Sequence, residues 1–91
     1  MTIEELYKII CDRRDNPTPD SYTAHLFSKG QDEILKKVGE ESIEVILAAK
    51  GQGTKRLIEE VADLTYHLLV LLSANSLTPS DITAELAQRH K

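Results

Sequence analysis

Residues 37–67 read KVGEESIEVILAAKGQGTKRLIEEVADLTYH and form two charged segments on either side of a glycine pair, Gly51 and Gly53. Charged residues lie at matching distances from the midpoint Gln52: Glu44 and Glu60 eight residues away, Glu41 and Asp63 eleven, Lys37 and His67 fifteen. If both segments are helices that fold back at the glycines, the acidic side chains meet at equal heights. The spacing therefore predicts a helical hairpin that builds one cluster of carboxylates from two segments.

Helical periodicity extends over most of the chain, and no segment alternates with period two. The two hairpin helices are expected over residues 32–50 and from residue 54 to residue 74 or 75, with Gly51 and Gly53 in the left-handed conformation that ends helices. Capping signals predict three shorter helices: from the capping box of Thr2 and Glu5 to about residue 14, from the cap Ser21 to about residues 29 and 30, and from Pro79 to about residue 89. The predicted fold class is all-α, with the hairpin forming a core like that of a four-helix bundle.

The second hairpin helix is apolar nearly all round beyond Leu68, which is typical of a helix buried on several sides. One chain of 91 residues has few other helices to cover it. We therefore expect one domain over residues 1–91, completed by a second copy in a homodimer or larger assembly.

Composition limits the partners. The net charge of −4 without a basic stripe disfavours general nucleic-acid binding. The longest apolar run, Leu68–Leu72, is far shorter than the roughly 20 residues of a membrane span, and the N-terminus lacks the pattern of a signal peptide. Cys11 is the single cysteine, which rules out an internal disulfide or a cysteine zinc cluster and fits a reducing compartment. We expect a cytoplasmic protein with neither a nucleic-acid nor a membrane partner.

The acidic side chains suggest a cation site. Two charges 6 Å apart repel by roughly 3 kcal/mol at an effective dielectric of 20, so four partly buried carboxylates cost on the order of 10 kcal/mol without compensation. Such a cluster is solvated, protonated or filled by a cation. Oxygen ligands favour Mg²⁺ or Mn²⁺, and the absence of a Glu-x-x-His pair argues against a di-iron site. The alternative is a solvated acidic helix face.

Magnesium held by carboxylates most often binds phosphate oxygens, and Lys37 is the cation best placed to add a phosphate contact. Ser21, Thr23, Lys29 and a glycine backbone either line an anion pocket or form only a capped turn. His67 either supports a metal ligand or is a core histidine bonded to a carboxylate. Both alternatives remain open at this point.

Several strings resemble known families. Glu40-Glu41-x-x-Glu44 followed by Glu60-x-x-Asp63 is similar to the signature of the all-α nucleoside triphosphate pyrophosphohydrolase (MazG-like) superfamily. Longer strings resemble the phosphoribosyl-ATP pyrophosphohydrolases of histidine biosynthesis: SYTA-x-LF-x-x-G at residues 21–30, KVGEE at 37–41, ADL-x-YH at 62–67 and RH at 89–90.

The resemblance implies a dimer of helical hairpins that hydrolyses phosphoribosyl-ATP to phosphoribosyl-AMP and pyrophosphate, the second step of histidine biosynthesis, with Mg²⁺ or Mn²⁺. The metal-binding acids it implies are Glu41, Glu44, Glu60 and Asp63. The catalytic residues it implies are Glu40, Glu41 and Lys37. Of these, Glu40 and Lys37 would hold a water or a phosphate, and Glu41 would bind the metal. The substrate-binding residues it implies are Ser21, Tyr22, Thr23, Lys29, Gly30 and His67.

Two other functions fit parts of the pattern. A house-cleaning hydrolase of noncanonical nucleoside triphosphates shares the acidic residues without the string at residues 21–30. A non-catalytic helical dimerisation module requires only the apolar faces and a solvated acidic face.

Overall fold

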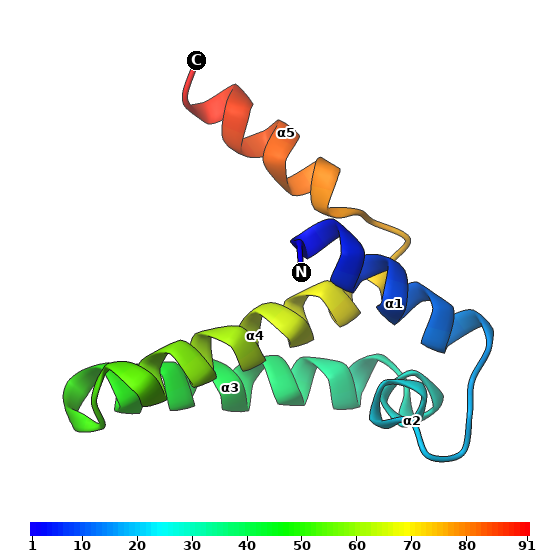
Figure 1. The fold of residues 1–91 in the computed structure, drawn as a ribbon. Coiled ribbons are helices and arrows are strands. Elements are labelled where there is room, and N and C mark those ends of the chain that lie inside the picture. Colours follow the sequence, from blue (N-terminus) through cyan, green and yellow to red (C-terminus); the bar gives the residue numbers. More distant parts are fainter.

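The computed structural model describes residues 1–91 as five helices without a strand (Figure 1). The helices are α1 (Ile3–Asp15), α2 (Tyr22–Lys29), α3 (Gln31–Gly51), α4 (Thr54–Ala74) and α5 (Pro79–Arg89). The predicted all-α class is confirmed, and each helix lies within a residue or two of its expected position.

The two long helices, α3 and α4, run antiparallel from the turn near Gly53, and they form the predicted hairpin (Figure 1). Gly53 has a φ of +88° and precedes α4, a conformation that favours glycine. The expectation of a left-handed Gly51 is wrong: Gly51 is the last residue of α3. The helix closes instead at Gln52, whose N–H donates to the Ala48 carbonyl at a φ of −103°. The chain therefore reverses at Gln52 and Gly53, and of the two glycines only Gly53 has a positive φ.

Side-chain caps fix the starts of the shorter helices. Thr2 and Glu5 form the expected capping box of α1, and Thr78 forms another with Asp81 at α5. The Ser21 Oγ accepts a hydrogen bond from the Ala24 N–H at 3.1 Å. These bonds satisfy amide groups that the first helical turn leaves without partners.

The core lies where α1, α2, α3 and α4 meet. It consists of one or two buried apolar side chains from each of these helices: Ile10, Leu26, Ile34, Leu69 and Val70. Arg14 ties α1 to α4, because its Nη1 donates to the backbone oxygen and the Oγ of Ser73 at 3.0 and 2.9 Å. The apolar end of α4 is thus covered on one side by α1, whereas Leu68 stays 42% exposed.

Much apolar surface remains uncovered. Only 11 of 91 residues are buried. Large apolar side chains are exposed along both hairpin helices: Leu35, Ile43, Ile46 and Leu47 on α3, and Ile58, Val61 and Leu68 on α4. α5 projects away from the other helices (Figure 1). None of the five helices combines the length and apolar character that a membrane crossing requires.

Candidate functional site

Three carboxylates from the two hairpin helices meet in the middle of the hairpin. Glu41 of α3 and Glu60 and Asp63 of α4 each present one oxygen, and these oxygens lie within 4.8 Å of one another. We call these three residues the acidic cluster. The hairpin thus brings acids of both segments together. Glu41 meets Asp63, which is equally far from the turn, as predicted, whereas Glu60 joins Glu41 and not Glu44, the residue at its own distance.

The other two acids of the pattern lie beside the acidic cluster. Glu44 is half-buried one helical turn beyond Glu41 and lies outside the group of close oxygens. Its charge still acts on Glu60, where it helps to raise the pKa. Glu40 is exposed and contributes to the negative potential around Tyr22.

Glu60 is the most enclosed member, with 4% of its surface exposed. Burial raises the pKa of its carboxyl group; the Arg56 guanidinium lowers it, and the charges of Asp63, Glu41 and Glu44 raise it again. Arg56 Nη2 donates to Glu60 Oε1 at 2.8 Å. Because the net shift is upward, Arg56 does not offset the combined effect of burial and the neighbouring acids on the Glu60 pKa.

The ion pair between Arg56 and Glu60 was not among the contacts predicted from the sequence. The signal was present in the spacing, because Arg56 and Glu60 are four residues apart on one helix.

The acidic cluster fits a hard divalent cation. Magnesium binds oxygens at about 2.1 Å, so ligands on opposite sides of one ion are about 4.2 Å apart. Oxygens that already lie within 4.8 Å of one another need only small side-chain movements to reach that spacing. Glu41, Glu60 and Asp63 would hold the ion, and Glu44 lies one helical turn beyond Glu41 on α3.

Lys37 borders the acidic cluster. Its Nζ lies 3.8 Å from Glu41 Oε1, and both side chains are largely covered. The ammonium group is therefore beside the carboxylates without a short hydrogen bond to them. Lys29 and Gly30 lie at the junction of α2 and α3, where Gly30 adopts a φ of +93°.

His67 links α2 to the acidic cluster. It is 5% exposed, and its Nδ1 lies 2.7 Å from the Asp63 backbone oxygen, while its Nε2 lies 3.1 Å from the Tyr22 hydroxyl. A carbonyl oxygen can only accept, so Nδ1 donates to Asp63, and in neutral imidazole Nε2 then accepts from Tyr22. His67 is therefore a buried histidine bonded to a backbone carbonyl rather than to a carboxylate, and it also holds Tyr22.

Tyr22 has a hydroxyl held by His67, and the residue as a whole is 52% exposed. Burial raises the pKa of its hydroxyl, and the charges of Glu41, Glu33, Glu40 and Asp63 raise it further. Thr23 forms a hydrogen bond with the Tyr66 hydroxyl, a contact that the sequence reasoning missed. Tyr66 also packs edge-on against His67, with ring centroids 4.9 Å apart. The sequence signal for Tyr66 is its place in the string ADL-x-YH, which gave it no role of its own.

Ser21 has a structural partner, because its hydroxyl oxygen caps α2 through the Ala24 N–H. The capped turn, which was one of the two alternatives for this segment, is therefore present. Thr23 and Tyr22 face α4, and Lys29 is exposed.

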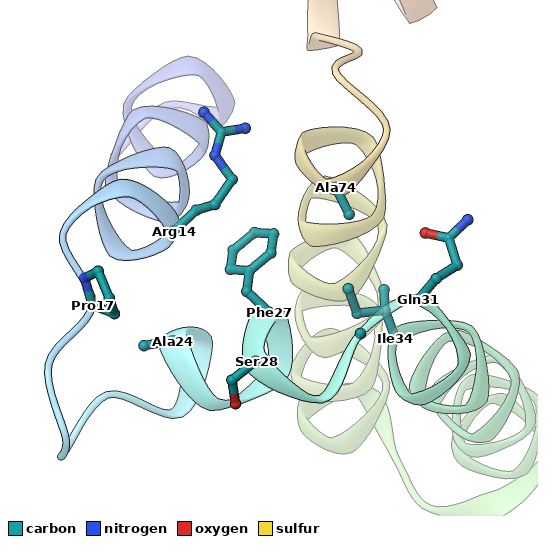
Figure 2. Close-up of a pocket in the computed structure, with 9 residues that line it drawn as sticks. Arg14, Pro17, Ala24, Phe27, Ser28, Gln31, Ile34 and Ala74 are labelled. Atoms are coloured by element: carbon teal, nitrogen blue, oxygen red, sulfur yellow. The ribbon is translucent and has the colours of Figure 1, made fainter.

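The largest hollow of the chain, about 480 Å³, lies elsewhere, at the junction of α1 with α2 and α3 (Figure 2). Its polar lining groups are already paired: Arg14 with Ser73 and Asp15, Ser28 with the His25 backbone oxygen, and Gln31 with Asn75. It contains no member of the acidic cluster. The chemistry of the chain is therefore concentrated on the hairpin.

Comparison with known proteins points to one family. The family model described as phosphoribosyl-ATP pyrophosphohydrolase matches residues 3–90. The phosphoribosyl-ATP pyrophosphatase of Pelotomaculum thermopropionicum is 54% identical over 89 residues, which cover 98% of this chain and 91% of that protein. The proteins of the same name from Limosilactobacillus fermentum and Saccharolobus solfataricus are 55% and 49% identical, covering 96% and 98% of this chain and 82% and 95% of theirs. With a match over nearly its whole length, this chain belongs to the phosphoribosyl-ATP pyrophosphohydrolase family.

Proposed function

We propose that this chain hydrolyses phosphoribosyl-ATP to phosphoribosyl-AMP and pyrophosphate, as a single domain over residues 1–91. Family membership and the names of relatives about 50% identical support this substrate. The observation that carries the proposal is the meeting of Glu41, Glu60 and Asp63 oxygens within 4.8 Å, because a triphosphate cannot approach such a cluster without a cation. The proposed cofactor is Mg²⁺, with Mn²⁺ as a substitute.

The proposed ligands of the cation are Glu41, Glu44, Glu60 and Asp63. When bound, the cation would act as a Lewis acid and neutralise negative charge on the phosphate oxygens. In hydrolysis, a water oxygen forms a new bond to phosphorus while the bond between the α- and β-phosphates breaks, and pyrophosphate leaves. Glu40 is exposed beside Glu41 without an ion pair, so it can hold the attacking water and accept its proton. Lys37 can donate to a phosphate oxygen.

Substrate contacts are proposed for the segment at α2. Tyr22 is an exposed residue whose hydroxyl is held by His67, and Thr23 is held by Tyr66. Lys29 adds a cation at the end of α2, and Gly30 adds a position without a side chain, although its N–H and carbonyl are bonded to Leu26 and Ile34. Ser21 supports this segment through its cap on Ala24.

A second copy of the chain is proposed to cover the hairpin. Exposed apolar residues recur three and seven residues apart on α4, at Ile58, Val61 and Leu68, and α3 exposes Ile43 and Ile46 in the same way. Two such hairpins can bury these stripes against one another as a four-helix bundle. The unpaired Cys11 is compatible with a cytoplasmic location.

The test is turnover of phosphoribosyl-ATP, compared with a panel of nucleoside triphosphates in Mg²⁺. The proposal predicts that phosphoribosyl-ATP reacts fastest and that Glu41→Gln reduces kcat at least about a hundredfold, while Glu59→Gln, which alters an exposed neighbouring acid, keeps it. Faster turnover of ordinary triphosphates would overturn the substrate assignment. Equal rates in both variants would overturn the role of the acidic cluster.

A further inference from the structure

Arg56 of α4 makes the shortest contact between a basic side chain and the acidic cluster. Its Nη2 lies 2.8 Å from Glu60 Oε1, whereas the other basic neighbour, Lys37, stays 3.8 Å from its carboxylate. Arg56 and Glu60 are four residues apart on one helix, so their side chains lie on the same face. The hydrolysis proposed above gives this arginine no role.

The two partners of this ion pair differ in burial. The side chain of Glu60 is 5% exposed, and that of Arg56 is 50% exposed. A buried carboxylate without a partner is costly, because it has lost its water without gaining an opposite charge. Arg56 reaches inward from the surface and supplies that opposite charge.

Arg56 can leave the pair more easily than Glu60 can. Its second contact, from Nη1 to Glu59 Oε1 at 3.5 Å, joins two half-exposed side chains and contributes little. The guanidinium group can therefore turn into solvent without leaving a buried group of its own unpaired. The Glu60 carboxylate is enclosed and stays where it is.

A divalent cation at the acidic cluster needs the same carboxylate. Glu60 supplies one of the three oxygens that lie within 4.8 Å of one another. A guanidinium group and a metal ion on one carboxylate repel each other, and solvent screens this repulsion only in part because Glu60 is buried. The arginine and the cation therefore compete for Glu60.

We propose that Arg56 is a displaceable counter-ion of the cation site: it holds the Glu60 carboxylate in the metal-free protein and gives way when a divalent ion binds. This inference rests on the cation site of the proposed function. Arg56 is thus a positioning residue, since it acts on the site through Glu60. Its presence stabilises the metal-free fold and lowers the affinity for the ion.

Removal of Arg56 should therefore have two effects of opposite sign. The metal-free protein should become less stable, because an ionised buried carboxylate loses its partner. The affinity for a divalent cation should rise, because the ion no longer displaces a competing charge. A residue with a merely structural role would not increase the affinity when it is removed.

The experiment combines Mn²⁺ binding, followed by electron paramagnetic resonance, with urea unfolding in a chelator at pH 7, both on the full-length chain. Arg56→Gln should bind Mn²⁺ about tenfold more tightly than wild type, as expected for one like charge removed from a partly buried site. It should also unfold at a lower urea concentration. Arg56→Lys keeps the positive charge and should stay within about threefold of the wild-type affinity.

Lys55→Gln is the matched control. It removes the same charge from the neighbouring residue, which is exposed, and it should change neither Mn²⁺ affinity nor stability. Circular dichroism checks that all variants keep their helices. In a Glu60→Gln background, Arg56→Gln should no longer reduce stability, because the charge that it compensates is absent.

Unchanged or weaker Mn²⁺ binding by Arg56→Gln would overturn the inference, and so would an equal gain in Lys55→Gln, which would reflect net charge alone. A loss of stability that persists in the Glu60→Gln background would also overturn it. The outcome is separable from that of the proposed function. If Asp63→Asn weakens Mn²⁺ binding but Arg56→Gln does not strengthen it, the cation site stands and the role of Arg56 is wrong.

Discussion

At the scale of single residues, Glu60 shows how the site opposes folding. Its carboxylate is buried beside Asp63 and Glu41, and the contact with Arg56 at 2.8 Å leaves its pKa above the ordinary value. A buried acid with a raised pKa destabilises the folded state whenever it is ionised. Glu60 therefore lowers the stability of the metal-free folded state, so its presence is not explained by folding stability.

This predicts a pH-dependent effect of Glu60→Gln in the metal-free protein. A raised pKa means that the folded state binds the Glu60 proton more tightly than the unfolded state does. The ionised carboxylate therefore lowers the free energy of unfolding at pH values above the folded pKa. This loss of stability disappears below the ordinary pKa of 4.5, where the group is protonated in both states. At pH 7 in a chelator, Glu60→Gln should be more stable to urea than wild type, and the difference should vanish towards pH 4.

Saturating Mg²⁺ should reverse the order of the two proteins, because a bound cation favours the ionised carboxylate. Glu59→Gln serves as the control, since Glu59 is exposed and outside the acidic cluster. A Glu60→Gln protein that is less stable than wild type in chelator at pH 7 would contradict this account of Glu60.

Ser21 offers a second residue-scale prediction. Its Oγ accepts from the Ala24 N–H, so Ser21→Ala should reduce the free energy of unfolding by about 1 kcal/mol through loss of the cap. Urea denaturation measures the change, and Ser28→Ala at an exposed site of the same helix is the control. Unchanged stability combined with a raised KM would show instead that Ser21 acts mainly on the substrate.

At the scale of elements, the turn of the hairpin sets the register of the acids. Gly53 has a φ of +88°, and beyond its chain neighbours no atom lies within 4 Å of the place where a Cβ would stand. Gly53→Ala should thus cost about 1–2 kcal/mol from backbone strain alone. Gly51→Ala is the matched control: it lies two residues away in helical conformation, and it should be neutral or stabilising by roughly 0.5–1 kcal/mol.

Thermal or urea unfolding of the two alanine variants measures their free energies of unfolding and tests this prediction. Equal stability of both, or a larger loss in Gly51→Ala, would show that the chain does not reverse at Gly53 as described.

The helices and the meeting of the acids could be predicted from the sequence because both depend on local spacing. Caps such as Ser21 and the equal distances of Glu41 and Asp63 from Gln52 are visible in the chain itself. The turn was predicted less well, because periodicity does not show which of two nearby glycines takes a positive φ.

Contacts between distant elements could not be predicted in the same way. The bond from Tyr22 to His67 and the bond from Thr23 to Tyr66 join α2 to α4 across more than 40 residues. They depend on how α2 lies against the hairpin, which no repeating pattern specifies.

At the scale of the whole molecule, the uncovered apolar stripes predict a dimer. Val61→Asp on the exposed face of α4 should convert the protein to monomers, because a charge would be buried without a partner. Leu86→Asp on α5 alters a similarly exposed apolar residue outside the hairpin and should leave the assembly intact. Sedimentation equilibrium measures the mass, and a monomeric wild type would refute the prediction.

The central claim is that Glu41, Glu60 and Asp63 together hold a divalent cation, and its most direct test is Mn²⁺ binding followed by electron paramagnetic resonance. The wild type and Glu59→Gln should bind with the same affinity, whereas Asp63→Asn should bind at least about tenfold more weakly, a loss of roughly 1.4 kcal/mol. Equal Mn²⁺ affinity in all three proteins would contradict the account.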